Sequence, residues 1–293
     1  MIRLSLIIIG LSALFACTNT SPENRDKTIS VSILPQKYFV SSITGPAYHI
    51  NVMVPPGASP EIYEAGFRQL NELANSSIYL KSGFLGFEDV WMKSIADLNP
   101  DLKIYDSSEG LPLLEQACEH DHEGHHHKEH HHDPHVWMSV SDAAIIARNT
   151  LQALLKAFPE DSSVFIANYQ QLSAEIDSVK AAYQASGEIL KGKSFIIYHP
   201  ALSYLAHEFD MEQIAIEYEG KEPPPSHLKN IIEKTAEFDK IYILIQKQFN
   251  PDNANSIAAE TGAEIVQIDP LNENWKEEML SLLDILIVIS ENQ

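Results

Sequence analysis

The chain of 293 residues is long enough for one large domain or two of ordinary size, and its 44% hydrophobic content is typical of a folded globular protein. Its formal net charge of -21 argues against nucleic acid as a partner, because the phosphates would be repelled. Cys17 and Cys118 are its two cysteines, so no internal disulfide can form if one of them is modified.

The N-terminal segment is predicted to lie outside the fold. An apolar run over residues 4–14 is too short to span a bilayer, and it ends at Ala16-Cys17. A small residue directly before a cysteine, after such a run, resembles a bacterial lipoprotein signal. The resemblance implies that residues 1–16 are removed, that Cys17 carries a membrane-anchoring lipid, and that residues 17–27 form a flexible tether.

The alternative is a plain signal peptide with an incidental cysteine. In both cases the folded body lies outside the cytoplasm, at the periplasmic side of a membrane or at the cell surface.

The first half of the folded region alternates short strands with helices. Runs rich in Val, Ile and Tyr predict strands at residues 28–34, 49–54, 77–80 and 102–105. Helices are expected from Pro35 to the residue before Gly45, from Ser59-Pro60 for a short stretch, and near residues 89–98. This alternation predicts a parallel sheet covered by helices.

Two helices and a second alternating region follow. Residues 142–157 read as one helix, and an apolar stripe at steps of four and three predicts another over about residues 161–189, roughly 40 Å long. Beyond Gly192, strands are predicted at residues 195–198, 213–217, 241–245 and 264–268. Helices are predicted at residues 226–238 and 252–261, with Gly262 as the stop of the second, and a buried helix is expected at the C-terminus.

The predicted fold class is therefore α/β, with two lobes that each contain a parallel sheet covered by helices. An N-terminal lobe over residues 28–158, which includes the loop 119–132, is joined by a linking helix over residues 159–191 to a C-terminal lobe over residues 192–293. Ligands of open α/β sheets bind beyond the C-terminal ends of the strands, so a ligand is expected in the cleft between the lobes.

Four side chains at such strand ends and connections form a candidate metal site: Glu61, His135, His199 and Asp269. Two imidazoles and two carboxylates suit a borderline first-row cation. Singly, each residue has an ordinary alternative: a packed histidine, a first-turn glutamate opposing a helix dipole, or an aspartate in a turn.

The sequence around these candidates resembles the zinc- and manganese-type solute-binding proteins of ABC importers. The matching segments run in that family's order along nearly the whole mature chain: Gly57-Ala58-Ser59-Pro60, Asp133-Pro134-His135-Val136-Trp137, Tyr198-His199 with Tyr204-Leu205, Glu222-Pro223-Pro224-Pro225-Ser226, Gln248-Phe249 with Ala258-Ala259-Glu260-Thr261-Gly262, and Asp269-Pro270-Leu271. The resemblance implies two lobes joined by one rigid helix, with the metal between them. It also implies that His135, His199 and Asp269 are ligands, and that the partner is a membrane permease.

Glu61 departs from this pattern, because many zinc-type members have a histidine there. A carboxylate can ligate zinc, but it also moves the preference towards harder ions such as Mn²⁺. The expected cargo is Zn²⁺, with Mn²⁺ as the alternative.

A histidine-rich loop is the second metal signal. Between residues 120 and 132 lie eight histidines: His120, His122, His125, His126, His127, His130, His131 and His132. The loop is expected to bind metal weakly as an auxiliary chelator, and zinc-type members of the family often carry such a loop. The alternative is a solvated low-complexity insertion. Its HExxH pattern contains Gly124 and lacks an apolar helix face, which argues against a zinc protease. Cys118 is expected to be passive, with a thiolate ligand as the alternative.

The expected function is high-affinity capture of a divalent ion by a monomeric transport receptor, which catalyses no reaction and delivers the ion to an ABC importer permease. A metal buffer or adhesin on the same fold remains an alternative. A zinc metallohydrolase would need a general base and a substrate pocket, and the sequence identifies neither.

Overall fold

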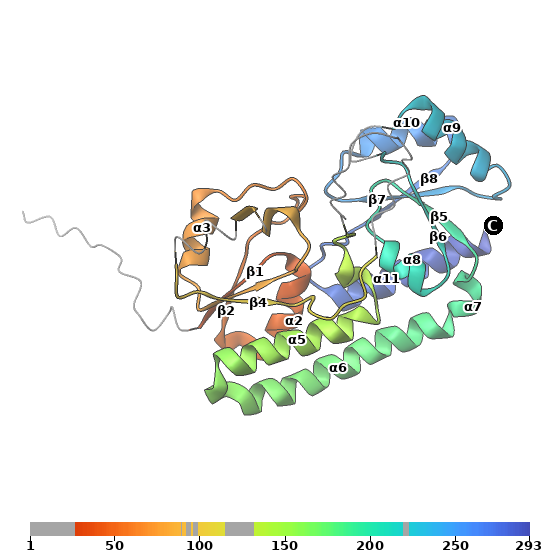
Figure 1. The fold of residues 1–293 in the computed structure, drawn as a ribbon. Coiled ribbons are helices and arrows are strands. Elements are labelled where there is room, and N and C mark those ends of the chain that lie inside the picture. Colours follow the sequence, from red (N-terminus) through yellow and green to blue (C-terminus); the bar gives the residue numbers. More distant parts are fainter. Residues whose placement is uncertain (1–26, 89, 92–94, 96–98, 115–131, 219–222) are drawn as a thin grey trace, which may run out of the picture.

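The computed structural model describes residues 27–88, 90–91, 95, 99–114, 132–218 and 223–293. Two α/β lobes lie side by side, and long helices run along the base of both (Figure 1). The predicted signal segment 1–16, most of the tether 17–27 with Cys17, and seven of the eight loop histidines lie outside the described residues.

The N-terminal lobe is built on a parallel sheet of four strands in the order β2-β1-β3-β4. Its strands are β1 (Thr28–Val31), β2 (His49–Val52), β3 (Ile78–Lys81) and β4 (Lys103–Asp106). The helices α2 (Leu34–Thr44) and α3 (Phe67–Ala74) belong to this lobe. In the register of the sheet, Ile29 lies between Ile50 and Ile78, which places apolar side chains together in the interior.

The C-terminal lobe repeats this arrangement, with the strand order β6-β5-β7-β8 and every described pair parallel. Its strands are β5 (Ser194–Ile197), β6 (Glu212–Ala215), β7 (Tyr242–Gln246) and β8 (Glu264–Ile268). Its shorter helices are α8 (Ser203–Glu208), α9 (Pro225–Lys234) and α10 (Pro251–Thr261). Gly262 ends α10 in the left-handed conformation that glycine adopts most readily, as the sequence predicts.

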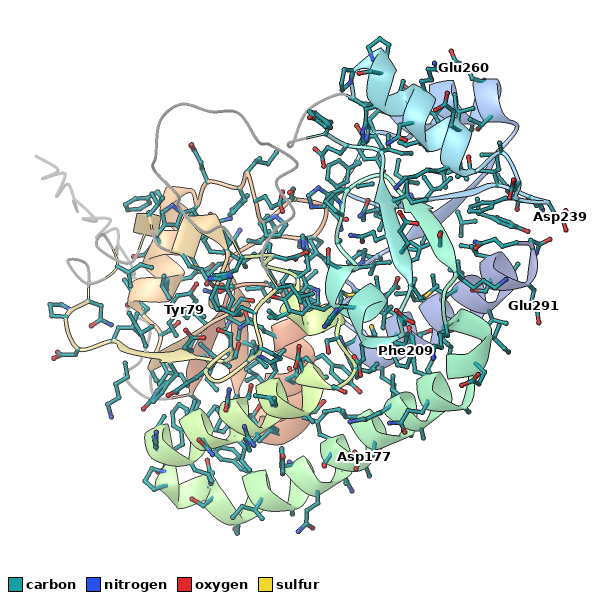
Figure 2. The ribbon with its side chains drawn as sticks, turned by 45° about the vertical axis from the view of Figure 1, so that its right-hand side comes forward. Tyr79, Asp177, Phe209, Asp239, Glu260 and Glu291 are labelled. Atoms are coloured by element: carbon teal, nitrogen blue, oxygen red, sulfur yellow. The ribbon has the colours of Figure 1, made fainter. Side chains whose placement is uncertain are left out.

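Long helices connect the two lobes. They are α5 (Asp142–Ala157), α6 (Ser162–Ala185) and the terminal α11 (Trp275–Glu291). The remaining short elements are the helix α7 (Gly187–Leu190) and the 3₁₀ turns η1 (Gly45–Ala47), η2 (Val136–Met138) and η3 (Pro159–Asp161). The 24 residues of α6 extend about 36 Å at 1.5 Å per residue. Its buried face is the predicted apolar stripe, whereas Asp177 lies on its outer side, away from both lobes (Figure 2).

One hydrophobic core continues from lobe to lobe. The same cluster of buried side chains contains Val31 of the first sheet, Ile197 of the second and Ile176 of α6. Two tryptophans add polar bonds at the lobe junction: Trp137 Nε1 donates to Pro270 O over 2.8 Å, and Trp275 Nε1 donates to Trp137 O over 2.7 Å. Displacement of one lobe must therefore disturb well-packed apolar contacts, which favours small movements over wide opening.

One predicted element is wrong. Ser59-Pro60 opens no helix, because the described chain forms only turns there and α3 begins at Phe67. Prolines at 55, 56 and 60 remove backbone donors, and no apolar period supports a helical face. The stretch between β2 and α3 is therefore an irregular segment. No described helix is both long and apolar enough to cross a bilayer.

Candidate metal centre

Three of the four predicted ligands converge from both lobes. Glu61 lies on the segment after β2, His135 directly precedes η2, and His199 follows β5 by two residues. One possible ligand atom from each of these side chains lies within 4.8 Å of the other two. His135 and His199 are buried, and their rings are 5.3 Å apart between centroids.

The distances are close to those of a coordination shell. Glu61 Oε1 is 3.2 Å from His199 Nε2 and 3.9 Å from His135 Nε2. Ligand atoms at about 2.0–2.1 Å from a tetrahedral zinc are separated by about 3.3 Å. The Glu61–His199 separation already matches this value, and the other two pairs would close onto one cation through small side-chain movements.

His135 is held in place by the carboxylate of Asp133. One carboxylate oxygen accepts hydrogen bonds from the backbone N–H of His135 over 2.8 Å and pairs with its ring Nδ1 over 2.9 Å. Asp133 is itself buried, and its carbonyl oxygen accepts a hydrogen bond from the Tyr204 hydroxyl of the other lobe. The Nδ1 contact turns Nε2 of His135 towards Glu61 as the free ligand atom.

His199 is held by a second carboxylate in an equivalent way. Glu217 Oε2 lies 2.5 Å from Nδ1 of His199, and the Gln246 side-chain amide donates to the His199 carbonyl. Phe249 stacks on the imidazole with ring centroids 5.2 Å apart. A carboxylate behind an imidazole fixes the ring and its tautomer, which increases its strength as a metal ligand.

Glu61 lacks this kind of support. Its side chain keeps 31% of its surface exposed. Within the irregular segment, the described backbone makes turn bonds only, from Ala58 N to Pro55 O and from Ile62 N to Ser59 O over 3.4 Å. The oxygen ligand is therefore placed by a loosely bonded chain segment, unlike either histidine.

The protonation states suit capture of a cation. Burial lowers the pKa of His199, but its hydrogen bonds to Glu217 and Glu61 outweigh this and raise the pKa to about 9. Burial raises the pKa of Glu61, yet the neighbouring His199 and His135 leave it below its usual value. Without metal, His199 thus holds a proton between two carboxylates, and a cation would take the position of the proton on Nε2.

The cavity at these side chains is very small. Its volume is about 20 Å³, and its lining includes Glu61, His135, His199, Phe249 and Trp137. A single water needs about 10–15 Å³ by this measure, whereas small-molecule sites occupy about 300–1,000 Å³. The cavity therefore has room for an ion with at most one or two small ligands.

Asp269, the fourth predicted ligand, is not in this group. Asp269 directly follows β8, just as Lys247 directly follows the neighbouring strand β7. The Asp269 carboxylate pairs with Lys247 Nζ over 3.1 Å. Gln248 Nε2 donates to its other oxygen over 3.2 Å. Asp269 lines a neighbouring cavity of about 180 Å³, and Gln248 lines both cavities.

His132 is the single loop histidine among the described residues, and it too lies outside the group. Its ring makes an edge contact with Phe84, with centroids 6.0 Å apart. Its Nδ1 is buried and makes no hydrogen bond to any described residue. The remaining predicted loop ligands and Cys118 are outside the described part of the chain.

The supporting carboxylates were not found from the sequence. Asp133 precedes His135 by two residues, and this spacing was the available signal. Glu217 is 18 residues from His199, and only the sheet register reveals the pair: Ile197 lies opposite Ala215, so two residues further on His199 meets Glu217.

Comparison with known proteins identifies the lineage. Residues 29–286 match the sequence model of the ZnuA family, which is described as the periplasmic component A of the zinc-uptake complex. The chain belongs to this family. Its match to the family thus covers both lobes and all four predicted ligand positions.

Individual relatives agree with this assignment. The zinc-binding lipoprotein AdcA of Streptococcus pneumoniae is 24% identical over 304 aligned residues, which cover 99% of this chain. The chain spans 59% of the length of that relative. A crystal structure of ZnuA has a TM-score of 0.79 at 29% identity, and covers 90% of this chain and 98% of its own. The periplasmic zinc-binding protein TroA of Treponema pallidum shares the fold, with a TM-score of 0.77 at 15% identity over 90% of this chain and 99% of its own.

Proposed function

We propose that this protein captures a divalent transition-metal ion, Zn²⁺, between its lobes and delivers it to the membrane permease of an ABC importer. In this proposal it acts as a monomer outside the cytoplasm, anchored through a lipid on Cys17, and catalyses no reaction. Membership of the zinc-uptake family and the zinc-binding name of a relative over 99% of this chain support the proposed cargo.

The observation that carries the proposal is the convergence of Glu61, His135 and His199 from opposite lobes on one small cavity. Because His199 comes from the C-terminal lobe and the other two from the N-terminal lobe, a shift between lobes would lengthen metal bonds on both sides. Such a site can bind tightly when it is closed and release the ion after a small movement.

The donor set favours zinc over manganese. Two imidazole nitrogens suit zinc, and zinc lies above manganese in the general order of divalent-ion affinity. Mn²⁺ remains the second candidate because Glu61 supplies a hard carboxylate oxygen. If Asp269 turned from Lys247 towards the ion, its second hard oxygen would strengthen the preference for Mn²⁺.

The site gives little support to a hydrolase. A cavity of about 20 Å³ cannot enclose an ester or peptide group together with a metal-bound water. Apart from the proposed ligand Glu61, the carboxylates beside the imidazoles are Asp133 and Glu217, and both are engaged with ring Nδ1 atoms. Neither is free to serve as a general base.

Metal analysis of the purified full-length protein tests this proposal. We expect one tightly bound zinc per chain that survives dialysis, and preference for zinc in competition with an equal concentration of manganese. The His135→Ala and His199→Ala variants should lose this ion. Tight binding that persists in both variants would place the ion elsewhere and contradict the proposal.

A further inference from the structure

Three apolar side chains of the N-terminal lobe are unusually exposed. Phe67 is 88% exposed, Ile62 84% and Val90 73%. The six other exposed large hydrophobic residues among those described are between 37% and 50% exposed. Scattered exposed apolar residues are ordinary, but the three largest exposures concentrated in one part of a fold are characteristic of a contact surface.

A ring contact joins the two segments that carry these side chains. Tyr63, next to Ile62, meets Trp91, next to Val90, edge to face with centroids 6.1 Å apart. Ala65 and Trp91 pack against the same small apolar cluster of the N-terminal lobe. Ile62 and Val90 are thus the chain neighbours of two rings in contact, and Phe67 begins α3 four residues after Tyr63. We name these three exposed side chains the apolar patch.

The fold gains nothing from the outward position of these three side chains. Tyr63, Ala65 and Trp91 supply the inward contacts of the two segments, whereas the patch residues leave most of their surface in water. Exposed apolar surface is unfavourable until something covers it. This suggests a partner that covers the patch for part of the time.

One residue of the patch is the direct chain neighbour of a residue of the candidate metal site. Ile62 directly follows Glu61, and both lie on the irregular segment whose described backbone–backbone hydrogen bonds are turn bonds. A partner that presses on or draws out Ile62 must move the backbone of Glu61. The patch is therefore placed where contact with a partner can weaken the hold on the ion.

The size and charge of the patch indicate the kind of partner. Three such side chains expose on the order of 400 Å², about half of the roughly 800 Å² per partner of a stable complex. That area fits a transient encounter better than a permanent dimer of this chain. Glu64 and Arg68 are both exposed beside the patch, so the partner should present an apolar surface whose rim carries both signs of charge.

We propose that the apolar patch is a docking surface for the permease of the metal importer, and that docking there loosens the ion by moving Glu61. This inference rests on the proposed function, since membership of a zinc-uptake complex family is what points to a permease as the partner. It adds the residues that make the contact and its link to a ligand.

The test compares two double variants of the full-length protein. Ile62→Ser with Phe67→Ser removes two patch residues but leaves Glu61 intact. Val164→Ser with Val288→Ser is the matched control, because these residues are 50% and 46% exposed on α6 and α11. Zinc affinity is measured for each, followed by zinc-dependent stimulation of the ATPase of the host's zinc importer in lipid nanodiscs.

We expect the patch variant to bind zinc within about twofold of the wild type, but to need at least tenfold more protein for half-maximal ATPase stimulation. The control should match the wild type in both assays. Normal stimulation by the patch variant would overturn the inference. So would a loss of its zinc affinity, since the residues would then serve the ion site itself.

Two further controls identify other occupants. If wild-type protein binds nanodiscs without importer and the patch variant does not, lipid covers the patch and the inference is wrong. If light scattering shows a wild-type dimer that the variant lacks, a second copy covers it and the inference is equally wrong. Failure of the wild type itself to bind zinc or stimulate the importer would instead refute the proposed function.

Discussion

The two histidines and the glutamate of the candidate site are supported in opposite ways. His135 and His199 are buried, each with a carboxylate on Nδ1, and their neighbours reach across the lobe junction. Glu61 is partly exposed on a segment held by turn bonds, beside the apolar patch. The difference suggests that the imidazoles supply most of the affinity, whereas Glu61 adjusts selectivity and release.

The largest expected effect is the loss of an imidazole. His199→Ala or His135→Ala should weaken zinc binding by more than about 100-fold, because outer-shell partners alone are worth about 10–100-fold. Competition with a fluorescent chelator measures the affinity. His207→Ala, an exposed histidine on α8, is the matched control and should bind zinc like the wild type. If Glu61→Ala weakened zinc binding as much as His199→Ala, the proposed distinction between Glu61 and the two histidines would be wrong.

Removal of the carboxylate behind His199 should have the next largest effect. Glu217→Ala is expected to weaken zinc binding by about 10–100-fold, since the imidazole would lose its orientation and its hydrogen-bond acceptor. The same chelator competition measures it. Glu212→Ala, an exposed carboxylate of the same strand region, is the control. An unchanged affinity would mean that packing against Phe249 alone holds the ring.

Zinc affinity should depend on pH through His199. Its pKa of about 9 in the metal-free protein means that a proton must leave before Nε2 can bind metal. The apparent association constant should therefore fall about tenfold for each unit by which pH is lowered below about 9, and level off above it. Calorimetry in buffers of different ionisation enthalpy should detect about one proton released per zinc at pH 7. Binding at pH 7 without proton release would contradict this state of His199.

Selectivity should depend on Glu61. Glu61→His is expected to raise the ratio of zinc to manganese affinity about tenfold, or about 1.4 kcal/mol, because an imidazole replaces a hard oxygen donor. Competitive metal loading followed by elemental analysis gives the ratio. Glu64→His, on the same segment but not among the three converging ligands, is the control. No change in the ratio for Glu61→His would mean that Glu61 does not contact the ion.

The smallest effect is expected from the histidine-rich loop. Deletion of residues 119–132 should change the affinity for the tightly bound zinc by less than about twofold, because the three converging ligands lie outside it. Weaker zinc equivalents should disappear from the titration. Loss of all tight binding on deletion would move the principal site into the loop.

Much of the fold can be predicted from periodicity. The apolar stripe that includes Phe165 and Tyr183 predicts α6 to within a few residues, and Gly262 marks the end of α10. The segment after β2 was misread because Ser59-Pro60 satisfies the local rule for a helix start, whereas helix propagation needs donors and an apolar face that the following residues lack.

The site was only partly predictable. His135, His199 and Glu61 were predicted from their places on connections between elements and converge in the structure, whereas Asp269, predicted in the same way, pairs with Lys247. Its contact with Lys247 depends on the pairing of β7 with β8, which places the two residues opposite each other. The carboxylate at Glu217 and the exposure of Phe67 likewise depend on tertiary structure and have no local signature.

The most direct test of the account is anomalous diffraction at the zinc edge from crystals of the zinc-loaded protein. It predicts one strong peak between the lobes, about 2.0–2.2 Å from His135 Nε2, His199 Nε2 and a Glu61 oxygen. A principal peak elsewhere, or one bound from a single lobe, would contradict the claim that the two lobes share one ion.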